Sequence, residues 1–194
     1  MRFPHEDDLR RERSRFMDTV ETLTDDEFAH GRTLCEGWTP RDVLAHLIGI
    51  DDTAGYFGLN ALTINRGNAR AVKTARALSR EELTARGQAT AENPVAASRA
   101  CSWLFAGDVA VHHLDVLRGL GRMDNLPENS ARLAFREGTV WSWRWGAKLL
   151  SHRVVPTTPG GKERGRGRVV RGSTENLALW LAGRESIASE LEFS

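Results

Sequence analysis

The stretch "GDVAVHHLDVLRGLGR", residues 107–122, combines charged and imidazole side chains with aliphatic residues at helical spacing. Two glycines near its end supply the stop signal of a helix. At about 100° per residue, Asp108, His112 and Asp115 fall on one side of that helix, within a sector of roughly 60°. An unpaired buried carboxylate is strongly destabilising, so this polar side must pair internally, bind a metal or reach water.

Apolar residues at three- and four-residue steps predict further helices on both sides of this stretch. The clearest start signal lies in "TPRDVLAHLIGID". There Thr39 is the predicted N-cap, Pro40 occupies the first helical position and Asp42 follows three residues after the cap. The four main helices are predicted over about 6–22, 40–62, 94–119 and 127–149, with a shorter one within "SREELTARGQAT".

The periodicity changes in the last quarter of the chain. The β-branched runs "HRVVPTT" and "GRVVRG", separated by the glycine-rich "PGGKERGRG", predict a strand, a turn and a strand, with a basic hairpin over 160–172. The segment "STENLALWLAGR" predicts a helix capped by Ser173 or Thr174. We therefore expect a mainly α protein, α+β overall, in which a four-helix bundle over 1–149 precedes a short strand–strand–helix segment over 150–194.

Composition limits the classes of partner. The 194 residues include 27 Lys plus Arg against 26 Asp plus Glu, a formal net charge of +1. This balance gives no overall field towards nucleic acid or a membrane surface, so neither is an expected partner. No leader-like start and no apolar run of membrane-spanning length occur, which favours a cytoplasmic location. Cys35 and Cys101 form neither a CxxC motif nor a dense disulfide set, so we expect two reduced thiols.

The polar side of the central helix suits a metal ion. An Asp and a His four residues apart project from successive turns, so Asp108 and His112 can supply two ligands to one ion. A third is predicted in His46, which lies on an apolar background in the neighbouring helix. Three nitrogen and oxygen ligands leave positions open for water or substrate, as in catalytic zinc sites. Asp115 is predicted to accept a hydrogen bond from a ligand imidazole. The alternative is an Asp–His pair that hydrogen-bonds without any ion.

Three other features have simpler explanations. His113 points away from the ligand side and is predicted to face solvent or to hydrogen-bond to a neighbour. Nothing beside Cys35 supplies a base or a cation, which favours a structural thiol over a nucleophile. The basic residues of 160–172 lack a reader motif or an aromatic platform. They therefore indicate a solvated hairpin, or contacts to an acidic thiol or substrate, rather than nucleic-acid binding.

Two segments in this order, "LCEGWTPRDVLAHL" at 34–47 and "GDVAVHHLDVLRGLGR" at 107–122, resemble the mycothiol-dependent maleylpyruvate isomerase family, within the DinB-like metal-binding four-helix bundles. The closing "GRGRVVRGSTENLALWLAGR" looks like the tail that many actinobacterial members carry. The arginine-rich composition agrees with such an origin. The resemblance implies His46, Asp108 and His112 as metal ligands, although the family pattern has glutamate where this chain has Asp108.

The resemblance also implies cofactors and chemistry. A divalent metal, with zinc as the expected ion, and mycothiol, the low-molecular-weight thiol of actinobacteria, would be the cofactors. Metal contact favours thiolate over thiol, so we expect a thiol transferase or thiol-assisted isomerase acting on a small electrophile. No catalytic side chain is assigned, because the nucleophile comes from the cofactor, and a monomer or homodimer is expected. A metal-dependent hydrolase on the same bundle and a non-catalytic metal-binding stress-response protein remain as alternatives.

Overall fold

The structure, a computed structural model, describes residues 3–51, 64–122 and 126–194. This part of the chain is mainly helical, with a small four-stranded sheet near the C-terminus. None of the helices in these described ranges is long and apolar enough to cross a membrane.

The chain forms two compact units, residues 1–109 and 110–194. The division falls inside a single helix, α8 (Ser102–Gly119). Asp108 lies in the first half of α8 and His112 in the second, so one continuous helix carries both. The expected boundary near residue 150, between bundle and C-terminal segment, stays a prediction.

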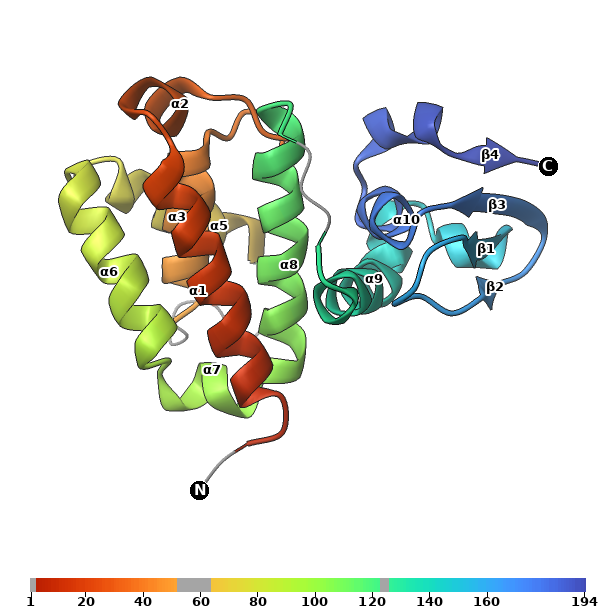
Figure 1. Cartoon of the computed structure of the whole chain (residues 1–194), viewed down its shortest axis with the longest axis horizontal. Coiled ribbons are helices and arrows are strands. Elements are labelled where there is room, and N and C mark those ends of the chain that lie inside the picture. The colour runs from red at the N-terminus through yellow and green to blue at the C-terminus, as the bar shows by residue number, and fades with distance from the viewer. Residues whose placement is uncertain (1–2, 52–63, 123–125) are drawn as a thin grey trace. The chain divides into compact units, whose positions relative to one another are not determined.

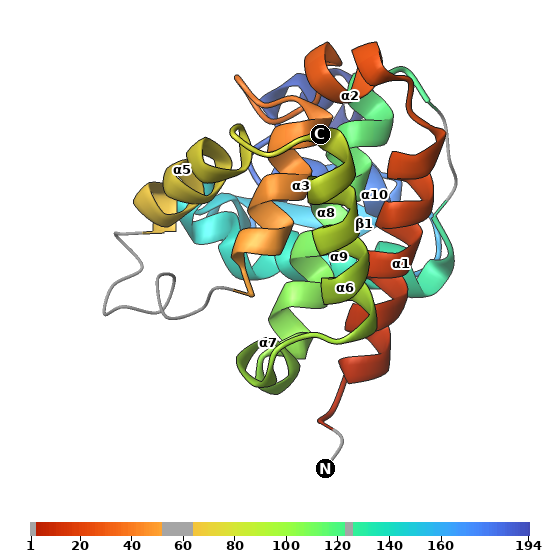
Figure 2. The ribbon, with the colours of Figure 1, turned by 90° about the vertical axis from the view of Figure 1, so that its left-hand side faces the viewer.

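The first unit is a helical bundle. Figures 1 and 2 show α1, α3, α6 and the first half of α8 running beside one another. The apolar stripe predicted for the first helix is buried at Leu9, Phe16 and Val20. Among the described residues, the helices that belong wholly to this unit are α1 (Glu6–Thr22), α2 (Asp25–His30), α3 (Pro40–Gly49), α5 (Ile64–Ala75), α6 (Arg80–Glu92) and α7 (Ala96–Ala100).

Helix α3 begins as predicted. The side chain of Thr39 accepts a hydrogen bond from the backbone N–H of Asp42, and the Asp42 carboxylate accepts one from the Thr39 N–H. This capping box satisfies two backbone donors that a helix start leaves without intrahelical partners. The helix ends at Gly49, and the last part of the predicted helix, residues 52–62, lies outside the described residues.

The fourth helix beside α1, α3 and α8 is α6, which the sequence predicts only as a short helix. Ser79 caps it through a capping box with Glu82. Gly87 lies where α6 meets its neighbours: a Cβ there would be 2.6 Å from Met17 Sδ and 3.0 Å from Leu44 Cδ1. The absence of a side chain at this glycine therefore lets α6 pack closely against α1 and α3.

The helix predicted over 94–119 is divided in two. Cys101, between α7 and α8, has φ −103° and ψ 22°, which takes the backbone out of the helical range before α8 starts at Ser102. The predicted stop is confirmed: α8 ends at Gly119, and Gly121 follows with φ 65°.

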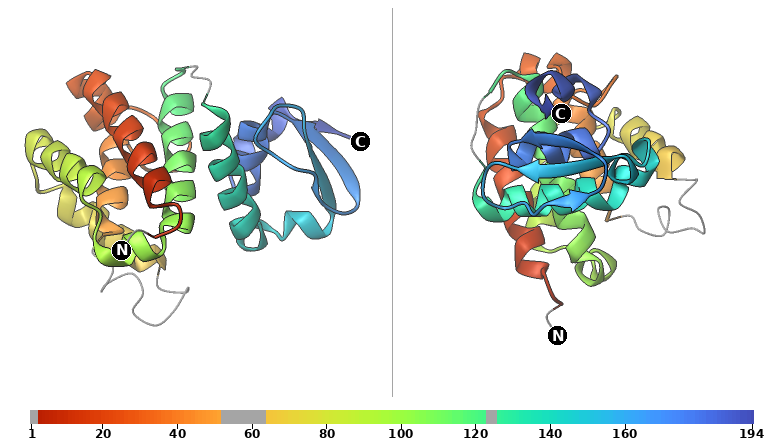
Figure 3. Two further views of the ribbon diagram at one scale, coloured as in Figure 1. Left: turned by 60° about the horizontal axis from the view of Figure 1, so that its bottom comes forward. Right: turned by 90° about the vertical axis from the view of Figure 1, so that its right-hand side faces the viewer.

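The second unit contains the end of α8, two further α-helices and the sheet (Figure 3). Helix α10 contacts α9 and strands β1 and β3. Ser173 caps α10, as predicted, and Val154, Val170, Leu177 and Leu181 are fully buried. The described elements of the second unit after α8 are α9 (Glu128–Trp141), the 3-10 turns η2 (Ser142–Trp145), η3 (Lys148–Leu150) and η4 (Glu185–Glu190), α10 (Thr174–Leu181), and strands β1 (His152–Pro156), β2 (Arg164–Gly165), β3 (Arg168–Gly172) and β4 (Glu192–Phe193).

The sheet has the strand order β2-β1-β3-β4, and β1 pairs with β3 in parallel. The prediction of a hairpin over 160–172 is therefore wrong. The intervening β2 pairs antiparallel with the other edge of β1, so β3 reaches β1 only after the chain has crossed over. Gly165 and Gly167 have φ values of 82° and 97°. A Cβ at Gly165 would lie 2.2 Å from the carbonyl oxygen of His152, so this turn requires glycine.

Helix α9 is shorter than predicted. It ends at Trp141, and the chain then passes through Gly146 and Ala147, whose left-handed backbone has φ values of 87° and 50°. Left-handed residues do not continue a right-handed helix, so the predicted helix stops early. Helix α9 packs tightly on α10, where a Cβ at Gly138 would lie 2.4 Å from the carbonyl oxygen of Ala178.

Candidate metal centre

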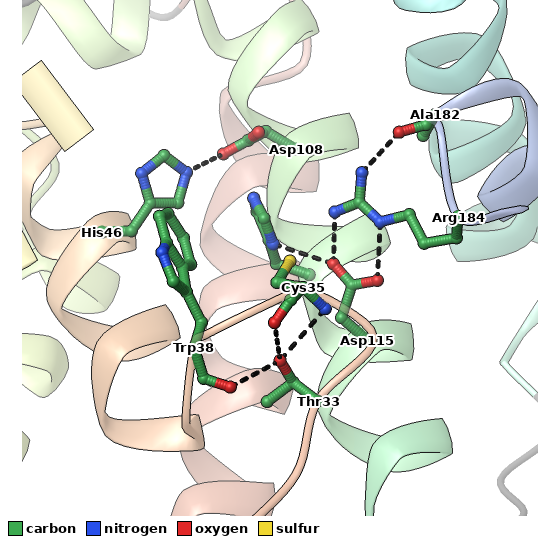
Figure 4. A network of polar contacts seen from close by, with 9 residues as sticks. Thr33, Cys35, Trp38, His46, Asp108, Asp115, Ala182 and Arg184 are labelled. Carbon is green, nitrogen blue, oxygen red and sulfur yellow. Dashed lines mark hydrogen bonds and ion pairs between the residues drawn. The ribbon is translucent and has the colours of Figure 1, made fainter. Parts of the chain in front are cut away.

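His46 and Asp108 meet in the first unit. His46 projects from α3 and is buried, and its Nε2 lies 3.3 Å from Oδ2 of Asp108 on α8 (Figure 4). The indole of Trp38 packs beside the imidazole, with ring centroids 5.2 Å apart. The side chain of Asp108 keeps 23% of its surface exposed. Part of the Asp108 side chain is therefore accessible to solvent.

Thr33 organises the loop that precedes α3. Its hydroxyl oxygen lies 2.9 Å from the carbonyl oxygen of Trp38 and 3.1 Å from that of Cys35, and it accepts a hydrogen bond from the Cys35 N–H at 3.1 Å. These contacts fix the loop that holds the indole against His46. Neither Cys35 nor Cys101 forms a disulfide, which agrees with the expectation of two reduced thiols.

His112 lies one helical turn after Asp108. Since α8 runs without a break through both residues, helix geometry places their side chains on the same side. His46, Asp108 and His112 each offer one ligand atom, and these atoms all lie within 4.8 Å of one another. The structure thus brings together the three residues that the sequence nominates as ligands, while their binding of a metal stays a prediction.

Asp115 has no exposed surface, and its carboxylate contacts the guanidinium of Arg184 and the imidazole of His112. Its Oδ2 lies 2.9 Å from Nδ1 of His112, and its Oδ1 accepts a hydrogen bond from Nε of Arg184 at 2.8 Å. Nη2 of Arg184 donates to Oδ2. Burial alone would raise the pKa of Asp115, but the charge of Arg184 and the hydrogen bond from His112 outweigh it and hold the pKa well below its usual range. Asp115 is therefore an ionised, fully buried acceptor.

The contact with Asp115 determines how His112 can act. A neutral imidazole that donates its Nδ1 proton to a carboxylate presents Nε2 as the ligand nitrogen. Two imidazole nitrogens and one carboxylate oxygen are donors that suit zinc and similar divalent ions. Cys35 with His112 and Asp115 forms a second group with the same spacing. Both oxygens of Asp115 already accept hydrogen bonds, so the group with His46 and Asp108 fits a metal better.

Two neighbouring polar residues have structural roles. Asp42, besides capping α3, accepts two hydrogen bonds from Arg76 at 3.0 Å. Burial tends to raise the pKa of Asp42, but Arg76 and Thr39 lower it overall. The capping role predicted for Asp42 is confirmed. His113 is only 2% exposed, which excludes the first of its two predicted alternatives, facing solvent, and leaves the second, a hydrogen bond to a neighbour. The side of α8 that carries His113 is therefore packed at this position.

Arg184 is the residue of this centre that sequence reasoning misses. It lies 69 residues after Asp115, and neither periodicity nor motif spacing links the two positions. The local signal is its place directly after Gly183, at the predicted end of the C-terminal helix.

Residues 9–101 match the family described as the mycothiol maleylpyruvate isomerase N-terminal domain. This match covers just under half of the chain, and these residues are similar to that domain. The family that this match describes is the one that the sequence segments resemble, and the segment at 34–47 lies within the match. The match to the family includes His46 and ends before Asp108 and His112, so α8 with its two candidate ligands lies outside it.

The whole fold has counterparts among solved structures. A crystal structure of the mycothiol-dependent maleylpyruvate isomerase, 19% identical, and one of a mutant of that enzyme, 18% identical, each match with a TM-score of 0.58. Each comparison covers 99% of this chain and 93% of the other. At this identity the likeness concerns the fold, and it confirms the expected helical bundle followed by a small α/β segment. A comparison with curated proteins gave no match.

Proposed function

We propose that this chain is a metal-dependent enzyme that uses mycothiol, as a thiol transferase or thiol-assisted isomerase acting on a small electrophile. The observation that carries the proposal is the group of two imidazoles and one carboxylate whose ligand atoms lie within 4.8 Å. The family match over residues 9–101 and the shared fold support mycothiol as the thiol.

His46, Asp108 and His112 would hold the metal, for which we propose zinc. A divalent ion there would stabilise a thiolate over a thiol at neutral pH. Aspartate is one methylene shorter than the glutamate of the family pattern. The 3.3 Å contact between Oδ2 of Asp108 and Nε2 of His46 supports the view that the shorter side chain still reaches the ligand group.

The residues of the chain orient and shield this group. The indole of Trp38 covers one side of His46, and Asp115 keeps the His112 ring in one orientation. The exposed edge of Asp108 leaves an approach for the thiol and the substrate. The chain thereby supplies positioning and partial exclusion of water, while the nucleophile belongs to the cofactor.

Metal analysis of protein purified without a histidine tag tests the first half of this proposal. We expect a near-stoichiometric divalent ion that is lost in His46→Ala and in His112→Ala. His30→Ala is the matched control, because His30 also lies beside an aspartate, Asp26 at 3.1 Å, but on an exposed surface. A native protein without metal, or equal loss in the control, would contradict the metal site.

Titration with mycothiol, followed by calorimetry, tests the second half. Binding should require the metal and should disappear with an analogue that lacks the thiol. Equal binding to metal-free protein would contradict the proposal. Turnover of ester or amide substrates without any added thiol would instead favour a metal-dependent hydrolase.

A further inference from the structure

Three side chains of the second unit form a line of contacts that ends at a candidate ligand. Two nitrogens of Arg184 meet the two oxygens of Asp115, and Oδ2 of Asp115 meets Nδ1 of His112 at 2.9 Å. All three residues lie within 110–194, and the side chains of Arg184, Asp115 and His112 are 13%, 0% and 10% exposed. The line is therefore almost entirely shielded from water.

The backbone around the end of α10 fixes where Arg184 lies. Gly183 has φ 91°, and a Cβ there would lie 2.5 Å from the indole of Trp145, so glycine is required. The N–H of Arg184 donates to the carbonyl of Leu179 at 3.0 Å, and its Nη1 donates to the carbonyl of Ala182 at 2.6 Å. These bonds close the helix end and aim the guanidinium before it meets Asp115.

A buried carboxylate needs hydrogen-bond donors or positive charges beside it, so the partners of Asp115 determine where it lies. The planar guanidinium holds the carboxylate through two parallel hydrogen bonds, which fix its rotation as well as its position. With Asp115 fixed, its Oδ2 becomes a stationary acceptor for Nδ1 of His112. The imidazole is then restricted in rotation, and Nε2 is directed to the side of α8 that also carries Asp108.

We propose that Arg184 is a positioning residue of the metal centre, which acts through Asp115 to orient His112 for metal binding. The inference rests on the proposed metal site and adds a residue from the C-terminal segment to it. Arg184 itself does not touch the metal. Its contribution is the orientation of one ligand ring, and partners of this kind typically change metal affinity by about 10- to 100-fold.

Cobalt(II) provides the test, because both its affinity and its visible absorption spectrum report on the ligand set without any turnover. Wild type and Arg184→Gln are titrated with Co²⁺ alone. We expect affinity about tenfold weaker in Arg184→Gln, with an altered spectrum. Arg184→Lys should recover only part of the affinity, because an ammonium cannot make two parallel bonds to a carboxylate.

Arg118→Gln is the matched control. Arg118 also lies on α8 and also contacts the C-terminal segment, through Asn176 at 2.8 Å and Glu190 at 3.1 Å. It does not touch Asp115 or His112 in any contact described above. Cobalt affinity and spectrum should stay at wild-type values in this variant, even where stability falls.

The double variant Arg184→Gln with Asp115→Asn separates positioning from folding, because it removes both buried charges together. We expect stability to recover towards wild type while cobalt affinity stays lowered. Wild-type affinity and spectrum in Arg184→Gln or in the double variant would overturn the positioning role and leave the proposed function standing. Absence of cobalt binding in wild type would overturn both.

Discussion

The two halves of α8 carry carboxylates in opposite situations. Asp108, in the first half, is 23% exposed and lies 3.3 Å from the imidazole of His46. Asp115, in the second half, is fully buried and bound by Arg184 and His112. A carboxylate that the protein satisfies completely holds other side chains in place. A carboxylate that stays partly exposed is held by the protein to a smaller extent, so similar residues on one helix are in different environments.

Alanine substitutions in the metal-free protein should give the largest contrast. Asp115→Ala leaves the guanidinium of Arg184 buried without its counterion, and breaking a buried pair costs about 3–5 kcal/mol. Asp108→Ala removes a partly exposed group and should change the free energy of unfolding by less than about 1 kcal/mol. Urea unfolding measures both. Equal losses would show that the two carboxylates have the same structural role.

Two helical glycines, Gly87 in the first unit and Gly138 in the second, allow another comparison. Gly138→Ala places a Cβ 2.4 Å from the backbone carbonyl of Ala178, which cannot move without its helix. Overpacking of this kind should cost about 2 kcal/mol. Gly87→Ala meets the flexible end of Met17 at 2.6 Å and gains about 1 kcal/mol of helix propensity, so its net effect should be small. Thermal unfolding of the two variants measures the difference. A larger loss of stability in Gly87→Ala than in Gly138→Ala would show that the tighter helix contact is the one at Gly87.

Acidification should reduce the stability of the first unit through Glu6, by less than the substitutions above. The hydrogen bond from Arg10, together with the Phe3 N–H and Arg99, overcomes burial and lowers the pKa of Glu6 from 4.5 to about 2. A carboxyl whose pKa is lowered by folding stabilises the fold fully when the pH is above the pKa of the unfolded state. That stabilisation is lost as the pH falls from about 4.5 to about 2.

Glu6→Gln isolates this contribution. The difference in Tm between wild type and Glu6→Gln should be constant near neutral pH and shrink through the acid range, because the amide does not titrate. A difference that stays unchanged down to the lowest pH would contradict the assignment to Glu6.

The sequence predicts those features that depend on neighbouring residues. The cap formed by Thr39 and Asp42 and the stop at Gly119 follow from local backbone chemistry. The common side of Asp108 and His112 follows from helical periodicity alone. The association with His46 needed a further assumption, that the two helices lie next to each other. The structure supports that assumption through the 3.3 Å contact.

Features that depend on tertiary packing could not be predicted in the same way. The parallel pairing of β1 with β3 depends on the position of β2 at the other edge of β1. The sequence pattern of two short β-branched runs is the same whether the strands pair in parallel or antiparallel. The role of α6 depends on its contacts with α1 and α3, helices that are distant from it in the sequence. Arg184 reaches Asp115 across 69 residues, and no local pattern records such a pair.

The continuity of α8 has a consequence for changes in the length of the chain. Four residues of an α-helix rise about 6 Å, so the separation of Asp108 from His112 is set by the helix itself. An insertion or deletion of a single residue between them would rotate one donor by about 100° and dismantle the pair. Changes after the helix, by contrast, leave the pair intact. The spacing of the two candidate ligands therefore withstands changes of length elsewhere in the chain, but not between residues 108 and 112.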